Sequence, residues 1–355
     1  MTPGRAAQIQ AIAAALAPEL DPNRDYPALS AQAERWRETR PLEGLRVLCG
    51  TPLFLNTAAQ FAALLAGGAE LAVAYSDELG FDPAMPDFLA GIGLTLFRGA
   101  DEAANSGAGF DAVLDCSALN RRVPARLGYC ELTRSGVLLY ESEPPEKPVF
   151  AADSGRIKSI ETVLGTGDGC LRGLRHIGFD PMGKTVLLFG HGRVGRSIEY
   201  VLTRAGAAIR IADPAQGKPF TPALLDGAEL VISATGVLHA LAPFAPLLLD
   251  SGAVLVNMGA DDEFGPDIPP GRAVNGKRPV NFMLREPTAT RYIDPTLALH
   301  NAGIPELVRH AGKSGILTPP AELEEAILSD VRGAGVINSE IDALGAEPPF
   351  PSVHR

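Results

Sequence analysis

Three glycines occur at fixed spacing in the stretch VLLFGHGRVGRS, at Gly190, Gly192 and Gly195. They follow an apolar run typical of a buried strand and open a segment with helical periodicity. In such a turn the first glycine allows the tight bend, the second lets the backbone approach a pyrophosphate, and the third lets helix and strand pack closely. The helix that begins at Arg193 and Val194 then faces the phosphate charge. The stretch therefore predicts a dinucleotide site.

The acidic residue Asp213 ends the next predicted strand, IRIAD, at the spacing where a carboxylate binds ribose hydroxyls. Since a carboxylate repels a 2′-phosphate, Asp213 favours NAD over NADP. Two later strands end in the small or amide residues of SATG and VNMG, at the edge where a dinucleotide lies. From these two strand ends we expect four more residues at the cofactor: Thr235, Gly236, Asn257 and Met258.

Composition narrows the class of protein. The chain has 355 residues and a net charge of -11. This length favours two lobes, and the acidic balance without a dense basic cluster argues against a nucleic-acid partner. No segment reaches the roughly 18 apolar residues that span a bilayer. The four cysteines are scattered and form no metal-binding motif, so we expect a cytoplasmic protein without a metal. From the charge and the apolar segments we expect a small-molecule substrate and no membrane.

Alternating strand and helix segments position these residues. After a helical region over 1–44, short apolar runs alternate with amphipathic stretches, which predicts βα units and a mostly parallel sheet. In this series GVLLYES (136–142) is assigned to a strand. A long helix is expected over about 157–177, and a second series follows with a helix between each pair of strands. Further helices are expected at LALHNAGIPELVRHAG and PPAELEEAILSDV. The predicted fold is therefore two-lobed α/β.

The order of motifs resembles one enzyme family. GHGRVG, IADP, SATG and VNMG resemble the NAD domain of S-adenosyl-L-homocysteine hydrolase, with its GYGxVGKG, TEIDP, TxTG and CNxGH. Outside this domain, CELTRSGV (130–137) resembles the family's SEETTTGV, and DSGRIKSIETVLGTGDG (153–169) resembles its NDSVTKSKFDNxYGCRES. ILTPPAELEEAI and the final LGAEPPFPSVHR resemble two C-terminal motifs. The resemblance covers roughly residues 45–355.

This resemblance implies a domain organisation and a chemistry. A substrate-type α/β lobe would comprise 1–155 and return at 291–330, around a Rossmann NAD-binding domain at 156–290, with a C-terminal tail at 331–355. The family forms multimers, which implies a homodimer or homotetramer. In the family, bound NAD oxidises a sugar hydroxyl to a ketone, which acidifies the neighbouring C–H and lets a thiol leave.

Several residues match positions that are functional in the family. Thr133 and Ser135 match hydroxyls that touch the nicotinamide end, and Lys158 lies one residue from the catalytic lysine. Glu161 aligns with the aspartate that follows this lysine, and its i, i+3 spacing places it on the same helix face as Lys158. Asp115 matches the first carboxylate of the family's LDDGG motif. The resemblance therefore implies catalytic roles for Lys158, Glu161 and Asp115.

Other family residues are missing. The HMT histidine falls on Pro52, the second carboxylate of LDDGG on Cys116, the sugar-binding glutamate on Leu132, and the histidine after NxG on Ala260. We therefore expect no efficient hydrolysis of S-adenosylhomocysteine. A further family histidine falls on Asp294, which we include among the catalytic candidates.

Two arginines are new relative to the family pattern. Arg134 stands between the two hydroxyl residues, and Arg291 lies in the loop that closes over the substrate in the family. A guanidinium in a cleft suits a carboxylate or phosphate, so both are assigned to binding an anionic substrate. His300 follows this loop. The sequence is compatible with two roles for it, a histidine in the core or at a helix cap, or an acid–base group.

Four functions fit these observations. The leading hypothesis is an NAD-dependent enzyme that performs redox chemistry or redox-assisted elimination on a small, anionic molecule other than S-adenosylhomocysteine. The alternatives are a specialised hydrolase of thioether nucleosides, a catalytically silent NAD-binding protein, and an ordinary 2-hydroxyacid or amino-acid dehydrogenase. Lys158 and Glu161 favour an enzyme, whereas the missing histidines favour the silent protein.

Overall fold

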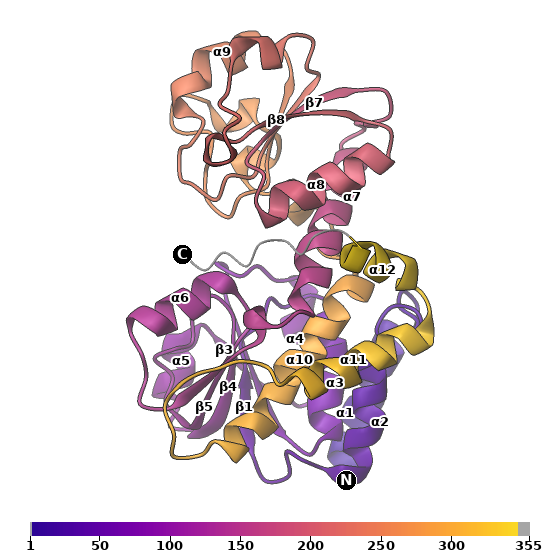
Figure 1. Ribbon diagram of the computed structural model, residues 1–355. Coiled ribbons are helices and arrows are strands. Elements are labelled where there is room, and N and C mark those ends of the chain that lie inside the picture. The colour runs from indigo at the N-terminus through magenta and orange to yellow at the C-terminus, as the bar shows by residue number, and fades with distance from the viewer. Residues whose placement is uncertain (1, 347–355) are drawn as a thin grey trace. The chain divides into compact units, whose positions relative to one another are not determined.

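The protein is described here by a computed structural model that covers residues 2–346 (Figure 1). The chain divides into two compact units. The first contains residues up to Lys158 together with Thr290–Ala343, and the second contains Ser159–Ala289. The second unit is therefore inserted between two segments of the first.

The first unit is built on a seven-stranded sheet in the order β11-β6-β5-β4-β1-β2-β3. Every neighbouring pair is parallel. Because all strands run the same way, their carboxyl ends share one edge, where loops present side chains. The strands are β1 (Arg46–Cys49), β2 (Glu70–Tyr75), β3 (Thr95–Arg98), β4 (Phe110–Asp115), β5 (Ala125–Glu131), β6 (Pro148–Ala151) and β11 (Gly315–Leu317).

Helices cover this sheet, and α1, α2, α3, α10 and α11 gather on one side of it (Figure 1). Helix α10 approaches the sheet closely at Gly303, where a Cβ atom would lie 2.5 Å from the ring of Phe150. The helices are α1 (Pro3–Leu16), α2 (Pro27–Thr39), α3 (Thr57–Ala66), α4 (Ala84–Gly91), α5 (Ala100–Asn105), α6 (Arg134–Ser142), α10 (Thr290–Arg309), α11 (Ala321–Ala334) and α12 (Asn338–Ala346).

The second unit is a Rossmann-type half-fold with a four-stranded parallel sheet in the order β10-β9-β7-β8. Since β8 lies on one side of β7 and β9 on the other, the strand order reverses at the carboxyl end of β7, where α/β folds bind ligands. Its elements are α7 (Thr166–His176), β7 (Thr185–Phe189), α8 (Arg193–Arg204), β8 (Ala208–Ala212), β9 (Leu230–Ser233), α9 (Ala245–Asp250) and β10 (Val254–Asn257).

The structure confirms the two-lobed α/β fold and the second strand-helix series. The long helix expected near 157–177 is also present, as a helix from Lys158 to His176 whose segment Ile160–Gly165 is π-helical. The helices predicted near the end of the chain correspond to α10 and α11. The last part of the predicted tail, 347–355, lies outside the described residues.

Three local predictions were wrong. GVLLYES forms helix α6 because Thr133 caps its first turn and the buried Val137 and Tyr140 are spaced three residues apart. Between β8 and β9 the expected helix is reduced to short 3₁₀ turns, since three prolines interrupt residues 214–222. The segment around Arg291, assigned to a loop, is the first turn of α10.

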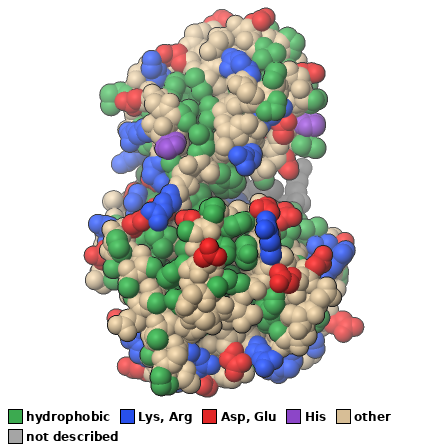
Figure 2. Space-filling view, turned by 180° about the vertical axis from the view of Figure 1, so that it is seen from behind, with side chains coloured by type: hydrophobic (Ala, Val, Ile, Leu, Met, Phe, Trp, Pro, Cys, Tyr) green, Lys and Arg blue, Asp and Glu red, His purple; other side chains and the backbone are tan. Residues whose placement is uncertain are grey.

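Charged side chains of both signs are interspersed on the surface shown in Figure 2, without a broad basic face. This distribution agrees with the net charge of -11. Among the described residues, no helix combines the length and apolar character needed to cross a membrane.

Candidate functional site

The three glycines of the turn after β7 have different surroundings. Gly190 has a φ of 85°, and a Cβ atom there would lie 2.4 Å from the carbonyl oxygen of Ala234. A Cβ atom on Gly195 would lie 2.1 Å from the carbonyl oxygen of Gly190. At Gly192, by contrast, a Cβ atom would meet nothing within 4 Å. Packing therefore requires the first and third glycines, while the second borders open space beside the N-terminus of α8, which suits a phosphate.

Asp213 lies beside this turn, because β8 is the neighbour of β7. Its Oδ2 atom accepts a hydrogen bond of 2.7 Å from the backbone N–H of His191, inside the turn. Its Oδ1 atom accepts one of 3.0 Å from the N–H of Ala215. These bonds fix the carboxylate at the carboxyl end of β8, where ribose hydroxyls lie in Rossmann-type sites. Arg193 and Val194 form the first turn of α8, and Val194 packs against the core of the unit.

The loop after β9 is held by a buried acid that sequence reasoning missed. Glu263 accepts hydrogen bonds from the backbone N–H groups of Thr235 at 2.8 Å and Gly236 at 2.7 Å, and from the hydroxyl of Ser233. Gly259 makes room for it, since a Cβ atom there would lie 1.9 Å from Oε1 of Glu263. In the sequence this residue is only one of three consecutive acids in DDEFG, and nothing singles it out.

The end of β10 is likewise held by its own side chains. The amide of Asn257 donates to the carbonyl oxygens of Gly259, Asp261 and Lys277, and its oxygen accepts from the N–H of Gly259. Met258 is buried in the core of the unit. Both residues shape the carboxyl edge of the sheet, and their contact with a cofactor stays a prediction.

Two buried carboxyl groups face each other at the carboxyl edge of the first sheet, where Asp115 on β4 pairs in register with Glu131 on β5. Asp115 accepts hydrogen bonds from the hydroxyl of Tyr140 at 2.7 Å, from the N–H of Cys116 and from both the backbone and the side chain of Asn120. Burial raises the pKa of its carboxyl. These contacts tie the following loop to α6, so the structure gives Asp115 a structural role and its catalytic role stays a prediction.

Glu131 is a second residue that sequence reasoning missed. It accepts hydrogen bonds from the N–H groups of Ser117, Ala118 and Thr133 and from the Thr133 hydroxyl, at 2.6–3.0 Å. Burial and the adjacent Asp115 raise the pKa of its carboxyl to about 7. A strand ending at Glu131 would have revealed it, but that strand, β5, was not predicted.

Thr133 and Ser135 lie at the first turn of α6, with their hydroxyl oxygens 3.3 Å apart. The Thr133 oxygen caps the helix by accepting from the N–H of Gly136 at 3.1 Å. Between them, Arg134 has a partly exposed side chain 4.0 Å from Glu141 on the same helix. Contact of these hydroxyls with a nicotinamide is not tested by the structure and stays a prediction.

Lys158 lies in the interior of the first unit with 4% of its surface exposed. Its charge acts on two other buried groups, the thiol of Cys116 and the imidazole of His300. Burial raises the pKa of the Cys116 thiol well above its usual value, an effect that Lys158 opposes only in part. The catalytic role that the resemblance implies for Lys158 stays a prediction.

His300 is a core histidine. Its Nε2 atom lies 2.7 Å from the carbonyl oxygen of Cys130, and its Nδ1 atom lies 3.3 Å from the amide nitrogen of Gln60. Nε2 therefore donates and Nδ1 accepts, which describes a neutral ring. Burial lowers its pKa to about 4, with a smaller contribution from the charge of Lys158. Of the two roles left open by the sequence, the structure favours the structural one.

Glu161 belongs to the second unit, three residues beyond Lys158. It lies in the π-helical segment Ile160–Gly165, where hydrogen bonds run from residue i to i+5. The predicted common face of Lys158 and Glu161 assumed α-helical spacing, which does not hold through this segment. The shared face of Lys158 and Glu161 and the catalytic role of Glu161 both stay predictions.

Asp294 is fully buried on α10 and caps helix α2. Its two oxygens accept hydrogen bonds from the N–H groups of Ala28 at 2.8 Å and Leu29 at 2.9 Å. Burial raises the pKa of this carboxyl to about 7. The sequence predicts a catalytic role for Asp294 because a family histidine falls on this position. The hydrogen bonds to α2 give Asp294 a structural role that needs no catalysis.

Arg291 stands at the start of α10, with its guanidinium 4.6 Å from the ring centre of Tyr292. The pKa of the Asp25 carboxyl is lowered against the effect of burial, mainly by its hydrogen bond from Arg24, and the charge of Arg291 adds a smaller contribution. The structure thus gives Arg134 and Arg291 different neighbours on different helices. Their convergence over an anionic substrate stays a prediction.

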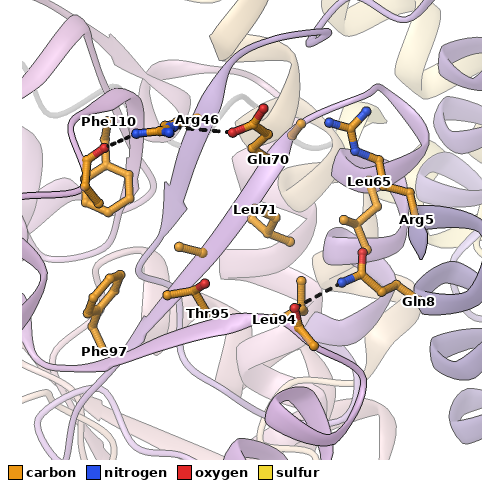
Figure 3. A pocket seen from close by; sticks show the side chains of 14 residues that line it. Arg5, Gln8, Arg46, Leu65, Glu70, Leu71, Leu94, Thr95, Phe97 and Phe110 are labelled. Carbon is orange, nitrogen blue, oxygen red and sulfur yellow. Dashed lines mark hydrogen bonds and ion pairs between the residues drawn. The ribbon is translucent and has the colours of Figure 1, made fainter. Parts of the chain in front are cut away.

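A cavity of about 480 Å³ opens at the opposite, amino-terminal edge of the first sheet (Figure 3). Phe97, Phe110 and neighbouring strand residues line it, and Arg5 and Arg46 lie at its rim. Both arginines already pair with acids, Arg5 with Glu43 and Arg46 with Glu70. The cavity contains none of the predicted site residues. Within residues 2–346, no group of three or more His, Cys, Asp or Glu side chains is arranged to hold a metal ion.

The sequence is similar to those of known proteins over about two thirds of the chain. The adenosylhomocysteinase of Sulfolobus acidocaldarius is 27% identical over 272 residues, which cover 66% of this chain and 64% of the relative. The S-inosyl-L-homocysteine hydrolase of Methanopyrus kandleri is 29% identical over 280 residues, covering 67% and 65%. The chain thus spans less than two thirds of the length of these curated relatives.

No protein-family model matches the chain. Among solved structures, a dipicolinate synthase component from Bacillus halodurans superposes with a TM-score of 0.47 at 15% identity, covering 75% of this chain and 99% of that one.

Proposed function

Since the chain is a divergent relative of the adenosylhomocysteinases, we propose that it is an NAD-dependent enzyme acting on a small molecule other than S-adenosylhomocysteine. The reaction we propose is oxidation–reduction or redox-assisted elimination. The observation that carries this proposal is the glycine turn, in which Gly190 and Gly195 are required by packing and Gly192 borders open space. The proposed protein is a cytoplasmic homodimer or homotetramer.

The residues of the turn would hold the dinucleotide. Backbone N–H groups at the start of α8 would face the pyrophosphate, and Asp213 would accept from the ribose hydroxyls. When bound, NAD would accept a hydride, which no amino-acid side chain can do. We assign the nicotinamide contacts to Thr133 and Ser135, as the resemblance implies.

On the side of the substrate, Lys158 is the proposed base. In its unprotonated form, an amine can take a proton from a C–H bond that an adjacent ketone has acidified. Cys116 and His300 do not compete for this role, because burial keeps the thiol protonated and both ring nitrogens of His300 are occupied by hydrogen bonds. Arg134 and Arg291 are the proposed contacts to an anionic group of the substrate.

A catalytically silent NAD-binding protein is the second candidate. The observation that favours it is the structural use of Asp115 and Asp294, whose oxygens are taken by backbone and side-chain donors. Mass spectrometry of the native purified protein is expected to detect bound NAD in both cases. The absorbance of NADH after addition of metabolite mixtures separates the two proposals, because an enzyme reduces its bound NAD when the correct substrate is present and the silent protein does not.

We expect the protein to bind NAD at least about tenfold more tightly than NADP, a difference of about 1.4 kcal/mol. Asp213→Asn keeps the shape of the side chain but removes the charge that repels a 2′-phosphate. The ratio of NAD affinity to NADP affinity should therefore fall. Titration calorimetry with both dinucleotides measures the ratio. Asp250→Asn, at the exposed end of α9, is the matched control and should leave the ratio unchanged. Equal affinity of the unaltered protein for NAD and NADP would contradict the assignment of Asp213.

A further inference from the structure

The side chain of His191, inside the glycine turn, joins three separate segments of the second unit. Its Nδ1 atom lies 3.0 Å from Oε1 of Gln216, in the loop after β8, and its Nε2 atom lies 2.6 Å from Oε2 of Glu199 on α8. The ring is largely enclosed, with 13% of the side chain exposed. The charge of the ring therefore depends on whether each ring nitrogen donates or accepts a hydrogen bond.

The orientation of the Gln216 amide is fixed by its other contacts. Its nitrogen donates to the carbonyl oxygen of His191 at 2.7 Å and lies 3.3 Å from Oδ2 of Asp213. A reversed amide would place an oxygen against both of these acceptors, which is unfavourable. Oε1 of Gln216 therefore faces the ring as an acceptor.

Both ring nitrogens of His191 thus face acceptors, an amide oxygen and a carboxylate, and both must donate. An imidazole donates from both nitrogens only when it carries a positive charge. The charged groups that face this residue are the carboxylates of Glu199 and Asp213 and the guanidinium of Arg196, whose Nε lies 3.3 Å from the His191 carbonyl oxygen. Of these groups only Glu199 contacts the ring itself, and its carboxylate favours the charged ring.

We propose that protonated His191 is a positioning residue for the dinucleotide site, acting as a clasp between the glycine turn and the Asp213 loop. When the ring loses a proton, one nitrogen presents a lone pair to an acceptor. If this is Nδ1, the Gln216 amide must turn over and release both the His191 carbonyl oxygen and Asp213. If it is Nε2, the contact to Glu199 is lost. The clasp rests on the proposed function, because it acts through Asp213 on dinucleotide binding.

Nitrogen NMR of the full-length protein, labelled with ¹⁵N-histidine, tests the charge of the ring without any ligand. We expect both His191 nitrogens to carry protons in the buffer used for NAD binding, because each nitrogen faces an acceptor. His176, an exposed histidine on α7, serves as an internal reference, and His191→Asn identifies the signal. A His191 ring with one unprotonated nitrogen in that buffer would overturn the proposal.

Titration with NAD tests the effect on binding. His191→Asn and Glu199→Gln should each bind NAD about tenfold more weakly than the unaltered protein, because each variant removes one end of the clasp. His176→Asn should match the unaltered protein. A charged ring together with unchanged affinity of both clasp variants would overturn the clasp. No NAD binding by the unaltered protein would instead contradict the proposed function, and the NMR result would still decide the state of the ring.

Discussion

Gly195→Ala is expected to destabilise the second unit and to abolish tight dinucleotide binding. A Cβ atom at this position would lie 2.1 Å from the carbonyl oxygen of Gly190, so α8 must move away from β7. Alanine improves helix propensity by about 1 kcal/mol, but overpacking against backbone costs about 1–3 kcal/mol or more. We therefore expect a net loss of up to about 2 kcal/mol in the free energy of unfolding, together with a loss of NAD affinity of at least about tenfold.

Denaturant unfolding and NAD titration measure these two effects. Gly333→Ala is the matched control, since it lies inside helix α11 and its Cβ atom would meet nothing within 4 Å. That variant should be as stable as the unaltered protein or more stable, by up to about 1 kcal/mol. If Gly195→Ala behaved like Gly333→Ala, the close packing of α8 on β7 would be refuted.

S-adenosylhomocysteine is expected to be turned over at least several orders of magnitude more slowly than by a true hydrolase. Cys116 and Leu132 stand where the resemblance places two carboxylates, and both side chains are buried. Burial keeps the Cys116 thiol neutral, because its pKa is raised well above the usual value. Each lost acid–base group is worth about 10²–10⁴-fold in rate.

Release of adenosine from S-adenosylhomocysteine, followed by chromatography with NAD supplied in excess, measures this rate. Prior confirmation that NAD is bound separates a missing activity from a missing cofactor. Adenosine release at roughly 1 per second or faster, an ordinary enzymatic rate, would show that these substitutions do not exclude the hydrolase reaction.

Local sequence signals predicted the second unit well. The glycine spacing, the apolar strand before it and the acid at the end of β8 lie within about one βαβ unit, so each signal is readable over a short window. GVLLYES was misread because its few apolar residues satisfy both the strand and the helix period, and the deciding cap, Thr133, lies outside the run.

Contacts between distant residues were not predictable. Asp294 caps a helix whose N–H groups lie 265 and 266 residues away in the sequence. Glu263 holds a loop that precedes it by 27 and 28 residues, and Glu131 holds one that precedes it by 13 and 14. An acid that serves such a purpose looks like any surface acid in the sequence, because only the folded chain brings its donors together.

The most direct test of a dinucleotide at the glycine turn is NAD titration of Gly192→Ala beside the unaltered protein. The added Cβ atom would meet no protein atom within 4 Å, and the φ of -76° at this residue suits alanine. We therefore predict unchanged thermal unfolding of the free variant but NAD affinity at least about tenfold weaker, because the methyl group enters the space assigned to the pyrophosphate. Equal NAD affinity of the two proteins, with equal stability, would contradict the assignment.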